Sequence, residues 1–404
     1  MFDADLQHHE SRLDRLQIAA LCGLMVLGTL FVYSATMVTE SAVSTAFYNQ
    51  TWFRQVIWYA LGIGAAAGIC FVDYHTIARW SMVIYCIPIL LLVAVLIPGI
   101  GKTHGWGARR WIDLGPFQGQ PSEFAKLAFI LAQAHFLSRP VEELRVALTF
   151  WKSIGLMLLP FVLILKEPDL GSALVLLPTG LAILFVAGIP RRYLVRLLGG
   201  VGLLAALFLA DVLFMPSKWQ IKLEDYQRRR LLVYFGKEDS PPPGASKADR
   251  ERRRKQQSDD SLNVRQALIS VGSGGLTGKG WRLGTQKALG FLPRPVAHND
   301  FIFSVIAEES GFVGSVIVLT LYGVVLFSGI RIAGQARDRL GKMMAVGVVA
   351  LLFSHVFINI GMNIRLMPVT GVPLPLLSYG GSSVLGSLIA MGILQNVYTH
   401  RKAY

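Results

Sequence analysis

Four groups of polar residues stand beside long apolar runs, where an ionisable side chain is costly to bury and is therefore a functional candidate. The first group extends from Arg109, Arg110 and Trp111 to Glu123 and Lys126. Glu123 and Lys126 are three residues apart, so they meet on one face of a helix. The pair predicts either a structural ion pair or a polar cavity that Lys126 faces.

Two further groups hold carboxylates next to predicted helix starts, Glu167-Pro168-Asp169 and His298-Asn299-Asp300. Asp169 and Asp300 can each cap the helix that follows, as can Ser122 at the start of its helix. The alternative for Asp169 is contact with a metal ion or a substrate. The alternative for Asp300 is a carboxylate that apolar neighbours partly desolvate, which would raise its pKa and make it a better base near neutral pH.

The fourth group is the segment Gly371–Ser383, in which two prolines and a pair of adjacent glycines interrupt any helix. Non-helical backbone at membrane depth is stable only against protein or a water-filled cavity, so the segment predicts a re-entrant element lining such a cavity. A similar glycine-rich break occurs at Gly272–Trp281. It lacks the spacing of a nucleotide-binding P-loop, although its free backbone N–H groups can bind a phosphate.

The elements that must position these groups are membrane helices. Of the 404 residues, 53% are hydrophobic and 16% are charged, whereas soluble domains average about 25% charged residues. This composition excludes a disordered chain, a disulfide-stapled secreted domain and an ordinary soluble enzyme, and the three cysteines have no metal or disulfide spacing. The sequence predicts an all-α, polytopic membrane helix bundle. We expect about ten transmembrane helices, at Leu16–Thr36, Trp52–Val72, Trp80–Ile97, Glu123–Leu137, Ile154–Leu165, Ser172–Gly188, Tyr193–Met215, Gly311–Ile330, Met343–Met362 and Ser382–Val397.

Lysine and arginine in the short loops set the orientation, and they are concentrated on the side of the N-terminus. By the positive-inside rule both termini are cytoplasmic. The net charge of +14 is then a matter of topology first, and no nucleic-acid partner is expected. Arg109, Arg110 and Arg365 fall on the outer side, where they contact either lipid head groups or an anionic ligand.

The large loop Met215–Asn299 lies outside and carries 25 of the 64 Lys, Arg, Asp and Glu residues. Loops longer than about 60 residues escape the charge rule. Its middle, Gly236–Asp260, contains a proline run and a basic run, which predicts a mobile, solvated stretch. Trp219–Phe235 mixes aromatics with arginines and suits the head-group surface. The four polar groups thus meet in the outer half of the bundle, around a wet cavity suited to an anionic, lipid-linked ligand.

At these motifs the chain resembles the SEDS family (shape, elongation, division, sporulation), and the resemblance covers nearly the whole chain as a single transmembrane domain, residues 1–404, that includes the loop 215–299. The elongation-type branch, RodA, is the nearer match, and the division-type branch, FtsW, is the second choice. The motifs that carry the resemblance are Gly107–Lys126, Glu167–Gly171, Asp225–Arg228, Gly272–Gly280, His298–Glu309 and Pro368–Ser383.

The resemblance implies an inverting peptidoglycan glycosyltransferase that polymerises lipid II at the outer face of the bacterial inner membrane. It implies a class B penicillin-binding protein and membrane proteins of the elongation complex as partners. The family's essential aspartate maps onto Asp300, the expected general base. No cofactor is required, although a divalent cation, Mg or Mn, would suit the pyrophosphate, and no metal ligands can be assigned. The expected substrate-binding residues are Arg109, Trp111, Glu123, Lys126, Asp169, Arg228, Gln266, His298 and Ser378.

Three other functions remain open from the sequence. Broken helices and intramembrane charge also suit a lipid II flippase. A septal glycan polymerase would carry most of the same motifs, although the division-type branch usually reads differently around Thr370–Pro373. A scaffold that only recruits a transpeptidase would need no Asp300.

Overall fold

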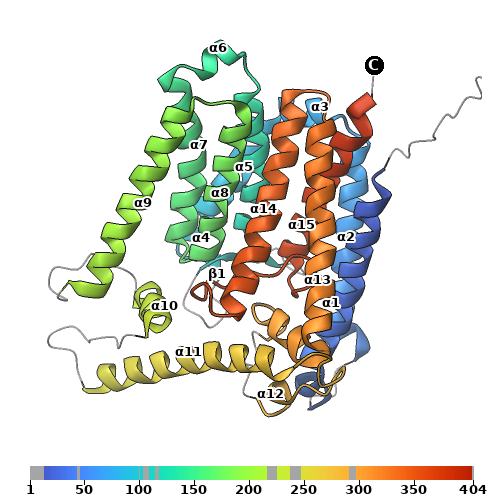
Figure 1. The fold of residues 1–404 in the computed structure, drawn as a ribbon, viewed down its shortest axis with the longest axis vertical. Coiled ribbons are helices and arrows are strands. Elements are labelled where there is room, and N and C mark those ends of the chain that lie inside the picture. The colour runs from blue at the N-terminus through green and yellow to red at the C-terminus, as the bar shows by residue number, and fades with distance from the viewer. Residues whose placement is uncertain are drawn as a thin grey trace, which may run out of the picture.

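The computed structural model describes residues 13–42, 46–99, 101, 102, 109–113, 118–215, 225–236, 247–290 and 297–402. Each of the ten predicted spans coincides with a helix of the bundle in Figure 1. These helices are α1 (Arg15–Ala42), α2 (Thr51–Cys70), α4 (Ser81–Leu96), α5 (Pro121–Leu137), α7 (Ala147–Lys166), α8 (Leu170–Ala187), α9 (Arg191–Phe214), α13 (Ile302–Gln335), α14 (Arg339–Asn363) and α15 (Gly381–Thr399). Within the described ranges, seven of them are long and apolar enough to cross a membrane, and α4 is shorter but apolar. The prediction of a polytopic helical membrane protein is confirmed.

Shorter elements connect these helices. They are η1 (Phe47–Asn49), α3 (Tyr74–Arg79), α6 (Val141–Leu144), α10 (Asp225–Phe235), α11 (Lys247–Ser273), α12 (Thr285–Ala288) and η2 (His400–Lys402). The strands β1 (Gly101–Lys102), β2 (Trp111–Asp113) and β3 (Gln118–Gly119) form a small antiparallel sheet that the sequence did not predict. In it Ile112 pairs with both Gly101 and Gly119, so the sheet ties the Arg110 segment to the start of α5.

The centre of the bundle is built around α5, α14 and α15. Helix α14 packs against both α8 and α13, and α15 packs against α2. Most side chains of α5 and α14 are buried, including polar ones such as Lys126 and His355. By contrast α9 leans away from its neighbours (Figure 1) and buries only Leu194 and Val212.

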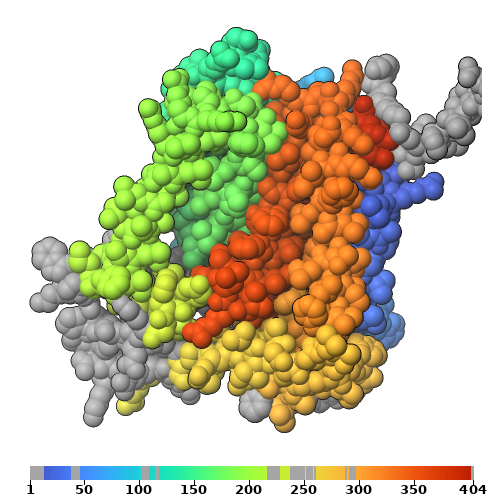
Figure 2. Space-filling view, in the orientation of Figure 1, coloured from blue at the N-terminus to red at the C-terminus, as the bar shows by residue number. Residues whose placement is uncertain are grey.

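Helix α11 lies across one end of the bundle. Figure 2 shows it covering the ends of α13 and α14, and we call this the Asp300 end. The prediction of a mobile stretch through Asp260 is wrong for residues 247–260, which belong to α11. No proline or glycine occurs between Lys247 and Val271, and the run is rich in helix-forming Arg, Lys, Gln and Ala. The proline run Pro241–Pro243 lies outside the described residues.

Helix α13 is broken at Gly311, which has φ 67° and ψ −160°. The break removes intrahelical acceptors from the N–H groups that follow, and the glycine-rich loop supplies replacements. Phe312 donates to the Gly275 carbonyl at 2.9 Å, and Val313 donates to the Leu276 carbonyl at 3.1 Å. The first half of α13 is therefore a separate short helix that begins at Ile302, two residues after Asp300.

Two adjacent glutamates fix the same glycine-rich loop to α13. Glu308 is fully buried and accepts hydrogen bonds from Lys279 Nζ at 2.6 Å and Thr285 Oγ1 at 3.1 Å. Glu309 accepts from Ser34 Oγ on α1 at 2.7 Å. The loop is thus bound to the bundle by ionic and backbone contacts, which holds its N–H groups in place.

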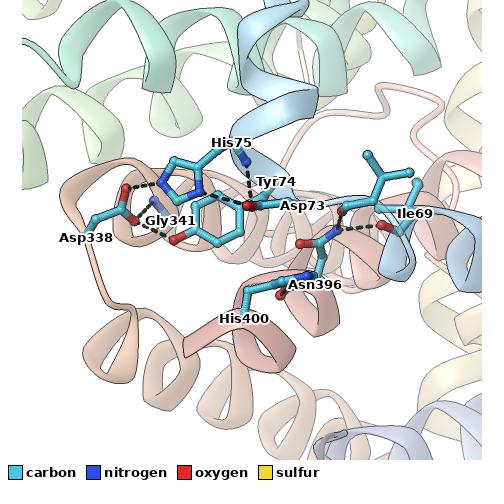
Figure 3. A network of polar contacts seen from close by, with 9 residues as sticks. Ile69, Asp73, Tyr74, His75, Asp338, Gly341, Asn396 and His400 are labelled. Carbon is cyan, nitrogen blue, oxygen red and sulfur yellow. Dashed lines mark hydrogen bonds and ion pairs between the residues drawn. The ribbon is translucent and has the colours of Figure 1, made fainter. Parts of the chain in front are cut away.

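The opposite end of the bundle, which we call the His75 end, is closed by the polar network in Figure 3. The ring nitrogens of His75 lie 3.0 Å from Asp73 Oδ1 and 3.0 Å from Asp338 Oδ2. Deeper in the same network, Asn396 donates to the backbone carbonyl of Ile69 at 2.5 Å. These contacts tie the α2–α3 turn to the α13–α14 turn and to α15.

The segment between α14 and α15 is non-helical, as its prolines and glycines predict, and its part from Thr370 to Ser378 is mostly buried in protein. Val372, Leu374 and Leu377 are at most 1% exposed. Leu376 is held at φ 64°, and its carbonyl accepts a hydrogen bond from the Tyr59 hydroxyl at 2.5 Å. The segment returns into the bundle beside the turn that carries Asp300.

Candidate active site

Asp300 stands in the turn before α13, beside the non-helical segment. A Cβ atom added to Gly371 would lie 3.5 Å from Asp300 Oδ2, so the backbone of that segment borders the carboxylate. Desolvation by the surrounding protein raises the pKa of Asp300 to about 6, with Asp169 adding to the rise. The positive charges of Arg230 and Arg110 act in the opposite direction. The helix cap alternative is wrong, because α13 begins after Phe301 and no side chain caps it.

Two arginines flank this carboxylate from different elements. Arg110 is half-buried and donates from Nε to the Glu167 carbonyl at 3.1 Å and from a terminal nitrogen to the Pro168 carbonyl. Arg230, on α10, donates to the Thr370 carbonyl at 3.2 Å. Both guanidinium groups are therefore anchored to the backbone while they remain close enough to act on Asp300.

The expected substrate-binding residues include Arg109 and Arg228, whereas Arg110 was expected to contact lipid head groups or an anionic ligand and Arg230 was not named. Arg109 is exposed, and Arg228 lies two residues before Arg230 on α10. Residues two apart on a helix differ by about 200° around its axis. The small sheet and the packing of α10 decide which arginine of each pair acts on the Asp300 carboxylate, and neither feature is visible in the sequence.

The Glu167-Pro168-Asp169 turn supplies the two carbonyls that bind Arg110. Asp169 accepts a hydrogen bond from Ser172 N at 3.1 Å, which confirms the prediction that it caps α8. It also accepts from Gln120 Nε2 at 3.0 Å. Glu167 is fully buried, and its carboxyl oxygens have no hydrogen-bond partner in the described part of the chain. Burial, together with the nearby charge of Asp169 and against that of Arg110, raises the pKa of Glu167 to about 9.

The Glu123–Lys126 ion pair is present, with Nζ to Oε1 at 2.8 Å. It is deeply buried, with Lys126 only 1% exposed, and it lines a cavity of about 20 Å³, enough for one water molecule. The sequence missed the third member of this group, His355 of α14, whose Nε2 lies 2.8 Å from Lys126 Nζ. The ring's Nδ1 lies 2.9 Å from the Leu351 carbonyl, so Nδ1 carries the proton and Nε2 accepts from Lys126. The sequence signal that could have revealed His355 is its spacing of four residues from Asn359, which is itself four residues from Asn363.

Ser122 does not cap α5, since that helix begins after Gln120 without a side-chain cap. Proline at the first helical position displaces Ser122 into the first turn, and its hydroxyl has no partner among the described residues.

The other predicted site residues are dispersed around Asp300. Ser378 is buried and donates to the Asn299 carbonyl at 2.5 Å. His298 is partly buried, with its ring 5.7 Å from that of Tyr379. Trp111 is partly buried in β2, and Gln266 is partly buried on α11. The structure therefore places His298 two residues before Asp300 and Ser378 in contact with the carbonyl of the preceding residue, and it leaves the roles of Trp111 and Gln266 as predictions.

The site joins one partly desolvated carboxylate to two anchored cations. Asp300 is partly exposed, and in the described ranges its oxygens accept no hydrogen bond, so they keep their acceptor capacity. A carboxylate with a pKa near 6 is ionised at neutral pH and able to accept a proton. Two guanidinium groups suit a phosphate or pyrophosphate. In the same ranges, no three His, Cys, Asp or Glu side chains gather closely enough to hold a metal ion.

Comparison with known proteins agrees with this arrangement. The family model of FtsW, RodA and SpoVE, described as cell cycle protein, matches residues 14–403. The peptidoglycan glycosyltransferase MrdB of Escherichia coli K12 is 37% identical over 380 residues, covering 94% of this chain and 93% of MrdB. A chain of a peptidoglycan synthase complex that coordinates polymerization and crosslinking is 29% identical, with a TM-score of 0.73 and coverage of 97% and 99%. A mutant of the rod shape determining protein RodA from Thermus thermophilus is 28% identical, with a TM-score of 0.66 and the same coverage.

Proposed function

We propose that this chain, which belongs to the FtsW/RodA/SpoVE family, is a peptidoglycan glycosyltransferase of the RodA type that polymerises lipid II during cell elongation. The observation that carries the proposal is the placement of Asp300 within reach of the charges of Arg110 and Arg230, next to the buried non-helical segment. A base beside two cations is what transfer of a sugar from a pyrophosphate requires.

In this reaction the 4-hydroxyl of the N-acetylglucosamine of one lipid II molecule attacks the anomeric carbon of the lipid-linked N-acetylmuramic acid of the growing strand. Asp300 takes the hydroxyl proton as the new carbon–oxygen bond forms. The bond between the anomeric carbon and the pyrophosphate oxygen breaks, and its electron pair leaves with the pyrophosphate. An α-linked donor thereby gives a β-1,4 linkage, which is an inversion.

Arg110 and Arg230 carry the charge of the leaving group in this proposal. Both side chains donate to backbone carbonyls, so they are held in place before the substrate binds. Preorganised cations are worth more at such a site than mobile ones, because they need no reorganisation as charge develops. A divalent cation, Mg or Mn, would add to this stabilisation of the leaving pyrophosphate. If one takes part, a chelator added to the assay should lower the rate of polymerisation.

We further propose that the Asp300 end faces outward from the bacterial inner membrane and that both termini are cytoplasmic. The concentration of Lys and Arg in the short loops of the other side supports this orientation. We propose a class B penicillin-binding protein as partner, alongside other membrane proteins of the elongation complex. The similarity to a chain of a peptidoglycan synthase complex supports a partner of this kind.

The test is polymerisation of labelled lipid II by the purified chain, with and without the penicillin-binding protein. We expect glycan polymer from the wild type and none from Asp300→Asn at equal expression. Glu142→Gln, an exposed carboxylate of α6 at the His75 end, is the control and should retain full activity. Transport of lipid II in proteoliposomes without any polymer would instead identify a flippase, and full activity of Asp300→Asn would refute the base.

A further inference from the structure

Three consecutive backbone carbonyls around the proposed base are each held by a side chain or N–H group from another part of the chain. The His298 carbonyl accepts from Tyr379 N at 2.9 Å, and the Asn299 carbonyl accepts from Ser378 Oγ at 2.5 Å. The Asp300 carbonyl accepts two bonds, from Asn359 Nδ2 at 3.0 Å and from Asn363 Nδ2 at 3.1 Å. The turn is thus held by four hydrogen bonds from outside it.

The two asparagines are one helical turn apart on α14, and both side chains are fully buried. Asn363 is oriented by Ser304, whose hydroxyl donates to Asn363 Oδ1 at 2.6 Å. Asn359 also donates to the Val372 carbonyl at 2.7 Å. Since both partners of Asn359 are carbonyl oxygens, its amide must present the nitrogen, and the reversed orientation would oppose oxygen to oxygen.

The bond to Val372 connects the base to the element that holds its cation. Val372 directly follows Gly371, which borders the Asp300 carboxylate. Thr370, the residue before Gly371, accepts a hydrogen bond from Arg230 through its carbonyl. The amide group of Asn359 therefore bridges the Asp300 turn and the segment whose Thr370 carbonyl accepts a hydrogen bond from Arg230. Its two bonds fix the separation between the carboxylate and the guanidinium group.

We propose that Asn359, supported by Asn363, is a positioning residue for the glycosyl transfer, setting the placement of Asp300 relative to Arg230. This inference rests on the proposed function. Asn359 touches no reacting atom and acts through the backbone of two segments. A displacement of about 1 Å at a reacting centre can cost about 100-fold in rate, so loss of the amide should be visible in kcat.

The experiment compares Asn359→Ala with Asn396→Ala in the full-length chain. Asn396 is a matched control, because it is also a fully buried amide that donates to two carbonyls, those of Ile69 and Val72, at the His75 end (Figure 3). We expect Asn359→Ala to lower kcat about 100-fold per folded molecule with KM changed less than threefold, and to move the acid limb of the pH profile. Asn396→Ala should lower thermal stability while kcat per folded molecule stays within twofold.

Equal kcat per folded molecule in the wild type and Asn359→Ala would overturn the proposal and leave a purely structural amide. If Asn359→Ala does not fold, Asn363→Ala is measured in the same way, because it removes one of the two bonds to Asp300 and keeps the bond to Val372. We expect it to lower kcat by about tenfold, and unchanged kcat would again overturn the proposal. Absence of polymer from the wild-type chain, with or without the penicillin-binding protein, would refute the proposed function itself, so the two failures are distinguishable.

Discussion

Replacing Arg230 by glutamine should move the acid limb of the pH–rate profile to higher pH. Arg230 is the first of the two positive charges that hold down the pKa of Asp300, which desolvation has raised from 3.8 to about 6. That rise is equivalent to about 3 kcal/mol. Without the guanidinium group, desolvation and Asp169 act against Arg110 alone, so the carboxylate should become a weaker acid.

The size of the shift follows from Coulomb's law. Two unit charges about 8 Å apart interact by about 1–2 kcal/mol at an effective dielectric constant of about 20–40, which is about one pH unit. With a pKa near 7 instead of 6, the ionised fraction at pH 7 falls from about nine-tenths to about one-half. Protonation of Asp300 alone thus lowers kcat/KM about twofold at pH 7. Loss of the positive charge that stabilises the leaving pyrophosphate lowers kcat/KM further at every pH.

The assay is initial-rate polymerisation of labelled lipid II between pH 5 and 9, since kcat/KM reports the groups of the free enzyme. Arg229→Gln is the matched control on the same helix and should leave the limb near pH 6, because Arg229 is not among the charges acting on Asp300. Asp169→Asn should move the limb to lower pH, since Asp169 raises this pKa. If the acid limb of the pH–rate profile of Arg230→Gln stays in place or moves to lower pH, the assignment of that limb to Asp300 beside Arg230 is refuted.

Two further substitutions test how the site is supported. In Glu167→Gln we expect a gain in thermal stability that grows from pH 5 to pH 9. The folded wild type keeps a proton on Glu167 up to a pKa of about 9 while the unfolded chain loses it near 4.5, so wild-type stability falls across that window; parallel melting curves at all pH values would contradict this. Gly311→Ala should lose about 2–4 kcal/mol, seen as a lower melting temperature, because its Cβ would lie 2.3 Å from Gly278 N at φ 67°. Gly323→Ala on the same helix, with open space around it, should be neutral, and equal effects of the two changes would argue against the steric reason.

The membrane helices could be predicted because each follows from a local property, a run of apolar residues long enough to span a bilayer. The same locality explains the Glu123–Lys126 pair and the Asp169 cap, which depend on spacings of three residues. The choice of Arg110 over its neighbour depended on a small sheet whose strands have only two or three residues. Short strands leave almost no periodic signal.

The contacts of α14 were out of reach for a different reason. Asn359 and His355 bind groups 59 and 229 residues away, on the Asp300 turn and on α5. Nothing in a single sequence records which distant carbonyl or amine an asparagine or histidine meets inside a bundle. A buried polar stripe at intervals of four residues indicates only that partners exist.

The interruption of α13 at Gly311 separates the short helix after Asp300 from the long segment that crosses the membrane. Transmembrane segments adjust to bilayers of different thickness by tilting. The N–H groups of Phe312 and Val313 bond to the glycine-rich loop and not to the preceding turn of α13. The membrane-crossing half of α13 can therefore change its tilt at Gly311 without turning the short helix after Asp300. We expect the same polymerising geometry in thin and thick lipid environments, a tolerance that an unbroken rod of this length would not give.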